Sequence, residues 1–332
     1  MQSLFTLLMV ATPCAVAMGY AAQRGSICAV RGVEAVIEHR SPRLFLSFLR
    51  ASGWVALVSM PLIWLGVGDA RLASNIWPSA LILGGACLFG VGAAINGGCS
   101  FGTLLRLAAG DISFLMTLVG LSLGFALQRL APWAPDPTAA GPSPLAQPHI
   151  AAIVAFAFLA VWALREMLHF PRRHAPESGG WAPEIAVVVM GVSGGVLYAL
   201  YGSWMYTVAL DRGLTAMMSD GIADVDLLVL FVGLLGGAAL AARRMRLWRF
   251  RLSAPQAIQR LVAGTMMGFG AALVPGGNDV LVLHALPALS AHALPAYAAM
   301  SAGVGLAVMV RRSVSRSEPS SLAGSNVDPE GS

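Results

Sequence analysis

The chain has 332 residues, of which 57% are hydrophobic and only 11% are charged, and its mean hydropathy is +0.73. Since soluble domains carry about 25% charged residues, this composition excludes an ordinary soluble domain and indicates an integral membrane protein. The formal charge of +5 comes from arginines in short loops between apolar segments, which indicates membrane topology and not nucleic-acid binding.

Apolar segments long enough to cross a bilayer recur along the chain. The sequence predicts nine spans, at roughly 4–22, 44–67, 79–97, 112–130, 150–170, 184–201, 225–242, 257–275 and 291–310. The first could also be a signal peptide, because Ala15-Val16-Ala17 resembles a cleavage site, but no basic segment precedes it, which favours an uncleaved span. Residues 131–149 are predicted to be a proline-rich external loop with no structure of its own, and 311–332 a disordered cytoplasmic tail.

The arginines also predict orientation. Eighteen fall on one side of the predicted spans, and three, Arg71, Arg129 and Arg212, fall on the other. Because cytoplasmic loops are rich in basic residues, the N-terminus is predicted to lie outside and the C-terminus in the cytoplasm. An odd number of spans agrees with that orientation.

Parts of the sequence occur twice. GVGAAINGG (90–98) returns as GFGAALVPGG (268–277), and RGSICAV (24–30) has a fainter partner in YGSWMYTV (201–208). We therefore predict two transmembrane repeats, 1–130 and 184–310, which are inverted because the single span 150–170 joins them. Inverted-repeat transporters bind substrate where broken helices of the two halves meet. The alternative is a chance similarity between glycine-rich apolar helices.

Two glycine pairs, Gly97-Gly98 and Gly276-Gly277, interrupt helices at membrane depth. Backbone outside a helix there must be buried in protein or line an aqueous cavity, which predicts broken or re-entrant helices beside a substrate path. The alternative is that the glycines only allow close helix packing. Ser100 is predicted to cap the short helix that follows it, and the N-terminus of that helix suits an anion.

Two of the four cysteines are candidate ligands. Cys28 and Cys99 each follow small residues beside a chain break, where a thiol offers a polarizable donor to a sulfur-containing ligand. Cys14 and Cys87 lie in regular apolar spans and are predicted only to pack. The sequence has no CxxC pair, no His/Cys cluster at zinc spacing, and no nucleotide, haem or flavin signature, so it predicts neither a metal site nor a cofactor.

The matched positions of the second half hold Met205 and Asn278, and Asp279 follows. Because a carboxylate at membrane depth is costly, Asp279 is a candidate protonatable coupling residue, or else the N-cap of the next helix. His284 and His292 could line an outer vestibule, although ordinary loop positions are the simpler interpretation.

RGSIC (24–28), GVGAAINGGCSFGTLLRLAAGD (90–111) and GFGAALVPGG (268–277) resemble the YeeE/YedE family of bacterial inner-membrane proteins. The resemblance implies an hourglass-like transporter of nine spans in two inverted halves, which takes up thiosulfate or a related small sulfur-containing anion. It also implies that the thiols of Cys28 and Cys99 pass the anion along by S–H···S hydrogen bonds. A third family cysteine is replaced here by Asn278, which can donate hydrogen bonds to an oxyanion but cannot hand over a sulfane sulfur.

The sequence leaves three functions open. The first is transport, with the two cysteines, the glycine breaks, Ser100, Asn278 and Asp279 along the path. The second is a sulfur-relay enzyme, in which a cysteine activated by Arg24 or Arg106 becomes a persulfide.

The third function is a sensor or scaffold that binds without transporting, because Met205 and Asn278 stand at the cysteine-matched positions. The arginine-rich segment 243–251 could dock an acidic cytoplasmic sulfur-carrier protein. Arginines of this kind also follow from the predicted topology alone.

Overall fold

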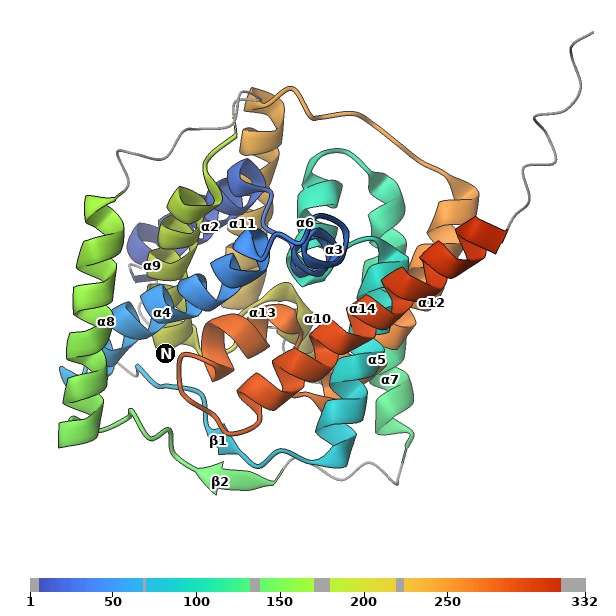
Figure 1. Ribbon diagram of the computed structural model, residues 1–332. Coiled ribbons are helices and arrows are strands. Elements are labelled where there is room, and N and C mark those ends of the chain that lie inside the picture. The colour runs from blue at the N-terminus through green and yellow to red at the C-terminus, as the bar shows by residue number, and fades with distance from the viewer. Residues whose placement is uncertain (1–5, 68–69, 132–137, 170–179, 219–223, 318–332) are drawn as a thin grey trace, which may run out of the picture.

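The computed structural model describes residues 6–67, 70–131, 138–169, 180–218 and 224–317, and it is 76% helical (Figure 1). Before the linking helix α8 (Ile150–Leu168), the chain forms η1 (Leu7–Ala11), α2 (Thr12–Gly25), α3 (Ala29–His39), α4 (Arg43–Trp64), α5 (Ala80–Asn96), α6 (Ser100–Ala108), η2 (Ile112–Phe114) and α7 (Leu115–Arg129). After α8 it forms α9 (Pro183–Tyr201), α10 (Tyr206–Met218), α11 (Val225–Arg244), α12 (Ala254–Leu273), α13 (Asn278–Val280), η4 (Leu281–Ala285) and α14 (Ala293–Ser317).

Several helices are suited to a bilayer, where each backbone N–H and C=O must be satisfied within the protein. In the described residues, seven helical stretches are long and apolar enough to cross a membrane: Arg43–Trp64, Ala80–Ala108, Ile112–Arg129, Ile150–Leu168, Pro183–Met217, Val225–Arg244 and Ala293–Val314. The count reaches eight if Ala254–Leu273 and Asn278–Ala285, bent by 41° at their break, form one span. The predicted all-helical polytopic membrane protein with broken helices is confirmed. The number nine is not confirmed and stays a prediction, and the predicted span 4–22 begins outside the described residues.

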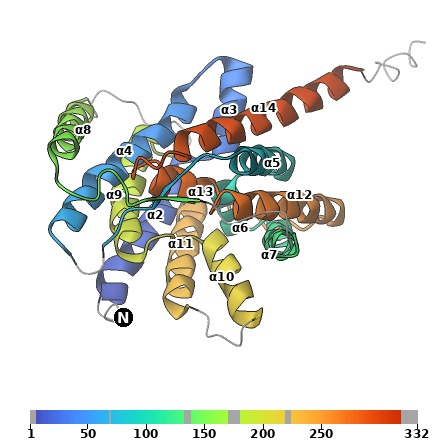
Figure 2. The same cartoon turned by 90° about the horizontal axis from the view of Figure 1, so that it is seen from below.

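The long helices form two groups, with short helices between them (Figures 1 and 2). One group contains α2, α4, α9 and α11, with α8 against α4 at its outer edge, and the other contains α5, α7, α12 and α14. The short helices α3, α6, α10 and α13 lie between the groups. The irregular backbone at their starts is thereby enclosed by protein and kept away from lipid.

The contacts between helices come in matched pairs. α2 packs on α11 as α9 packs on α4, α5 packs on α14 as α12 packs on α7, and α6 contacts α11 as η4 contacts α4. The two contacts in each of these pairs are equivalent if the series of helices α2–α7 corresponds in order to the series α9–α14. The inverted repeat stays a prediction, and these matched contacts support it.

Glycine lets α7 and α12 approach closely. The carbonyl oxygen of Leu121 in α7 lies so near Gly268 in α12 that an added Cβ would be 2.2 Å from it. Small residues at such crossings are the usual means of close helix packing in membranes.

We expect Gly268→Ala to lower the melting temperature of the purified protein, because its methyl group must push α7 away from α12. Overpacking of this kind costs about 1–3 kcal/mol. Gly236→Ala in α11 is the matched control, since nothing lies within 4 Å of the added Cβ there. Thermal unfolding in detergent compares the two, and equal melting temperatures would contradict a tight contact at Gly268.

The loop after α7 is partly ordered, contrary to the prediction that it has no structure of its own. Its strand β2 (Ala139–Gly141) pairs antiparallel with β1 (Asn75–Ile76). Ser143 Oγ donates to the carbonyl oxygen of Ala288 at 2.7 Å. These partners are far away in the sequence, and local composition does not reveal them; residues 132–137 lie outside the described part.

The predicted disordered tail is also helical in its first residues. α14 continues to Ser317, and Arg311 and Arg312 pair with Glu34 and Glu38 of α3 at 3.1 Å and 2.9 Å. The prediction of disorder is therefore wrong for 311–317, and residues 318–332 lie outside the described part.

Candidate functional site

The first helix break places Cys99 at the start of α6. Gly97 turns the chain after α5 with a left-handed φ of +75°, and Cys99 then enters α6 in an extended conformation. Cys99 is therefore the N-cap residue and Ser100 is the first residue of the helix. The prediction that Ser100 caps α6 is wrong, and its hydroxyl is left for other contacts.

Asn96, which the sequence patterns did not single out, fixes this break. Its buried side chain donates to the carbonyl oxygen of Gly98 at 2.8 Å and to Thr103 Oγ1 at 2.9 Å. Its Oδ1 accepts a hydrogen bond from Thr117 Oγ1 at 2.7 Å. A buried amide with its groups satisfied holds the backbone on either side in one arrangement. A polar amide within an apolar span is the signal that could have revealed this role.

The second break is built in a similar way. Gly276 follows α12 with a φ of +121°, and the extended Gly277 precedes the helical segment Asn278–Ala285. Gly277 is the N-cap residue, so Asp279 lies inside the first turn. The interpretation of Asp279 as an N-cap is therefore wrong.

The two candidate thiols are in contact. Cys28, at the start of α3, and Cys99 are both buried, and their sulfur atoms are 3.7 Å apart. The backbone N–H of Ala29 donates to Cys99 Sγ at 3.4 Å. A Cβ added to Gly102 would lie 2.8 Å from Cys28 Sγ, so α6 passes directly beside this thiol.

The two breaks meet at Gly277. A Cβ added there would lie 2.7 Å from Ser100 Oγ, 2.7 Å from Asp279 Oδ1 and 3.3 Å from Thr207 Cγ2. Asp279 Oδ2 accepts from Thr207 Oγ1 at 3.4 Å. We call Cys28, Cys99, Ser100, Gly277, Asn278 and Asp279 the central junction.

Polar atoms in the central junction are buried without hydrogen-bond partners. Ser100, Asn278 and Asp279 are at most 1% exposed. Both side-chain polar atoms of Asn278 have no partner in the described structure, and Ser100 Oγ and Asp279 Oδ1 have none beyond each other. Unpaired buried polar groups are costly and are rare in folded proteins, so this cluster is suited to bind a polar ligand.

A cavity of about 250 Å³ reaches the thiols, and we call it the thiol cavity. Cys28, Gly97 and Gly102 line its inner end, and Arg31, Arg106, Gln23 and Ser26 contribute polar groups. Arg31 follows Cys28 by one helical turn, a spacing that could have identified it from the sequence. Two arginines beside a thiol make this cavity suitable for an anion.

A second cavity of about 230 Å³, the hydroxyl cavity, is lined by Ser203, Thr207, Asp211, Gly276 and apolar neighbours. α5 and α12 cross antiparallel, with Gly85 beside Gly270 and Gly92 beside Ala263. Their C-terminal ends therefore point to opposite sides, and the thiol and hydroxyl cavities lie beyond opposite ends. The central junction lies between the two.

The other predicted site residues lie in different surroundings. The guanidinium of Arg24 lies over the rings of Tyr20 and Trp181, at 5.6 Å and 5.8 Å, and Arg24 is not among the residues that line the thiol cavity. Met205 is buried at the start of α10, as Cys28 is at the start of α3.

The two histidines are packed among other side chains. The ring of His284 stacks on Tyr198 with centroids 5.2 Å apart, and buried His292 has its Nδ1 2.9 Å from Ser290 Oγ. Neither histidine is among the residues that line the two cavities.

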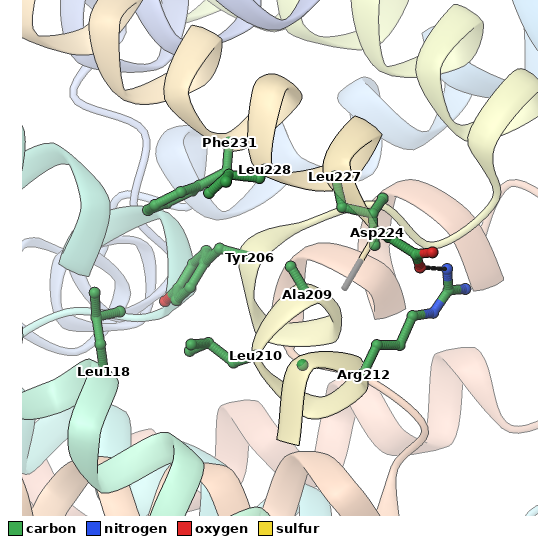
Figure 3. A pocket seen from close by; sticks show the side chains of 10 residues that line it. Leu118, Tyr206, Ala209, Leu210, Arg212, Asp224, Leu227, Leu228 and Phe231 are labelled. Carbon is green, nitrogen blue, oxygen red and sulfur yellow. Dashed lines mark hydrogen bonds and ion pairs between the residues drawn. The ribbon is translucent and has the colours of Figure 1, made fainter. Parts of the chain in front are cut away.

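A third cavity, of about 230 Å³, is largely apolar and lies between α7, α10 and α11 (Figure 3). Arg212 and Asp224 pair across one end at 3.2 Å, and Tyr206 lies toward the other (Figure 3). The hydroxyl of Tyr206 donates to the carbonyl oxygen of Ser100 at 3.1 Å. Tyr206 thus connects this cavity to the start of α6.

Comparisons with known proteins identify the family of this chain. A family described as sulphur transport matches residues 24–306, a region that contains both breaks and both central thiols. The thiosulfate transporter TsuA of Escherichia coli (strain K12) is 25% identical over 324 residues, which cover 84% of this chain and 88% of that protein. With the family matched over most of its length and with several membrane-spanning helices, the chain belongs to the sulphur transport (YeeE/YedE) family of multi-pass membrane proteins.

Proposed function

We propose that this protein transports thiosulfate, or a closely related small sulfur-containing anion, across the membrane through the central junction. The observation that carries the proposal is the pair of buried thiols, 3.7 Å apart, between the thiol cavity and the meeting point of the helix breaks. The similarity to a thiosulfate transporter gives the substrate class.

The chemistry of the site suits such an anion. A terminal sulfur atom is a soft acceptor for the weak S–H donors of Cys28 and Cys99. The Nδ2 group of Asn278 and the hydroxyl of Ser100 have unused hydrogen-bonding capacity and can donate to sulfonate oxygens. Asn278 thereby takes the place of a third thiol as an oxygen-binding group.

The orientation completes the proposed path. The arginine distribution predicts an external N-terminus and a cytoplasmic C-terminus in the bacterial inner membrane. The hydroxyl cavity then opens outward and the thiol cavity inward. An anion entering past Thr207 leaves beside Arg31 and Arg106, whose positive charges favour its arrival.

Growth of a bacterium that lacks its sulfate and thiosulfate importers tests the function. We expect the wild-type protein to restore growth on thiosulfate, but not on sulfate, which has no sulfane sulfur to meet the thiols. Uptake of radiolabelled thiosulfate by the same cells provides the direct measurement. Correctly inserted protein that binds thiosulfate without uptake would contradict transport and support a sensor or scaffold.

A sulfur relay is the second candidate, because Cys28 shares the thiol cavity with two arginines. In a relay, the Cys28 thiolate attacks the sulfane sulfur, the S–S bond of thiosulfate breaks, and sulfite leaves as a persulfide forms. Mass spectrometry of protein incubated with thiosulfate would detect one added sulfur atom. We expect no such addition and no sulfite release, since transport needs only an intact thiol.

Asn278→Cys tests the role of the substituted position. A thiol fits this buried site and supplies a third sulfur contact, so we expect faster thiosulfate uptake than in the wild type. Asn278→Ala is the matched control, and it should be slower because the amide donor is gone. Uptake rates measured at equal amounts of membrane-inserted protein compare the three. If Asn278→Cys takes up thiosulfate more slowly than the wild type, the Asn278 amide is needed to bind the oxygen atoms of the anion.

A further inference from the structure

Asp279 lies on the proposed path, at the point where the two helix breaks meet. Its side chain is fully buried in the first turn of the segment Asn278–Ala285, between the hydroxyl cavity and the thiols. One carboxyl oxygen contacts Thr207, and the other faces the point where Ser100 and Gly277 meet. An anion that passes from Thr207 to Cys99 must therefore pass this carboxyl group.

No cation neutralises Asp279 in the described structure. The titratable groups that face it are Tyr198 of α9, Tyr206 of α10, Cys99 with its partner Cys28, His284 of η4 stacked on Tyr198, and Tyr297 of α14 beside Cys99. The described ion pairs of the chain do not include Asp279. Arg31 and Arg106 line the thiol cavity, and Asp279 is not among the residues that line it.

An ionised Asp279 and a passing dianion would repel each other strongly, because the site is buried and poorly screened. A protonated Asp279 removes that repulsion and also supplies an O–H donor to the sulfonate oxygens. The ionised carboxylate lies beside the N-terminus of α6, which is the positive end of the helix dipole. The anion would bind at the same place. Protonation thus frees that helix end for the substrate.

On the basis of the proposed function, we propose that Asp279 carries a proton with each anion, so that the protein is a proton-coupled symporter. Hydronium in the hydroxyl cavity gives up the proton and becomes water, and an O–H bond forms on Asp279 as the anion enters. After the anion has moved on to the thiols, Asp279 returns the proton to water on the other side and is again ionised. No electrons move, and a dianion with one proton carries a single net negative charge.

Purified protein in liposomes tests the coupling. With the outside acidified relative to the lumen, we expect the wild type to accumulate radiolabelled thiosulfate above its outside concentration, and a protonophore to abolish the accumulation. Asp279→Asn should carry thiosulfate only to equal concentrations and at a rate independent of the pH difference. Asp279→Glu should keep the accumulation, since it keeps a carboxyl group one methylene away. The control is Asp224→Asn, an exposed carboxylate paired with Arg212, which should accumulate thiosulfate as the wild type does.

The outcomes separate the two proposals. If the wild type transports thiosulfate but never accumulates it, or if Asp279→Asn still accumulates it, the coupling is overturned and the transport function stands. If the membrane-inserted wild type transports no thiosulfate at any pH difference, both proposals fail together. Should Asp279→Asn not fold, loss of pH-driven accumulation in a folded Asp279→Glu variant would equally contradict the coupling.

Discussion

Cys99→Ala is expected to slow thiosulfate uptake roughly ten- to hundredfold. The sulfur of Cys99 contacts Cys28 Sγ at 3.7 Å and accepts the backbone N–H of Ala29 at 3.4 Å. In the proposed path its S–H also donates to the passing anion, and a hydrogen bond to a charged group is worth about 1.5–3 kcal/mol. Since about 1.4 kcal/mol corresponds to a factor of ten in rate, the expected range follows. Initial uptake rates in membrane vesicles measure the effect.

Cys14→Ala and Cys87→Ala are the matched controls. Both cysteines are partly buried in long helices, away from the central junction, and neither thiol contacts another cysteine in the described structure. Each variant should transport at close to the wild-type rate. We expect the uptake rate of Cys99→Ser to lie between those of Cys99→Ala and the wild type, because a hydroxyl still donates and accepts hydrogen bonds but is less polarizable than a thiol. A fully active Cys99→Ala would exclude the thiols from the path.

Gly277→Ala is expected to reduce uptake below detection while the protein stays folded. Its methyl group would lie 2.7 Å from both Ser100 Oγ and Asp279 Oδ1, and so would fill the point where the two breaks meet. The backbone at Gly277 has a φ of −78°, which alanine adopts without strain. The effect is therefore steric and local to the passage.

The control for this substitution is Gly84→Ala in α5, where nothing lies within 4 Å of the added Cβ. It should leave both uptake and melting temperature unchanged. For Gly277→Ala, uptake and melting temperature are measured on the same preparation. Wild-type uptake by this variant would show that the anion passes elsewhere.

The long helices and their breaks could be predicted from the sequence because each is a local property. Apolar length, paired glycines and a following thiol all occur within about 20 residues. The predicted spans from 44–67 to 257–275 agree with observed helices to within a few residues, whereas α14 continues past the predicted end at 310. The contact between Cys28 and Cys99 could not be predicted in this way. These residues are 71 positions apart, and only the tertiary fold, which brings the starts of α3 and α6 together, puts them in contact.

The errors at the breaks have a common physical cause. Serine and aspartate are favoured N-cap residues, so the sequence favours Ser100 and Asp279 as caps. The cap is decided by the last extended residue before the helix, and here those residues are Cys99 and Gly277. Ser100 lies one position after its cap and Asp279 two positions after its cap. Their side chains therefore face the central junction and do not cap the backbone.

The helices α3 and α10 could not be found as spans because they are short and carry charged residues. The residues that precede α3 and α10 nevertheless place the start of each helix next to one of the two helix breaks. Without α3, Arg31 could not share a cavity with Cys28. Without α10, Thr207 could not reach Asp279.

The most extensive contacts between long helices all join a helix before α8 to one after it: α2 with α9 and α11, α4 with α9, α5 with α12 and α14, and α7 with α12. Neither part of the chain is therefore an independent folding unit, since each would leave its largest helix faces against lipid. α8 itself packs mainly on α4 and is the least buried candidate span. α8 serves as a linker that keeps the two parts of the chain close together in the membrane. If the chain is cut beside α8, we expect the two fragments still to associate in the membrane.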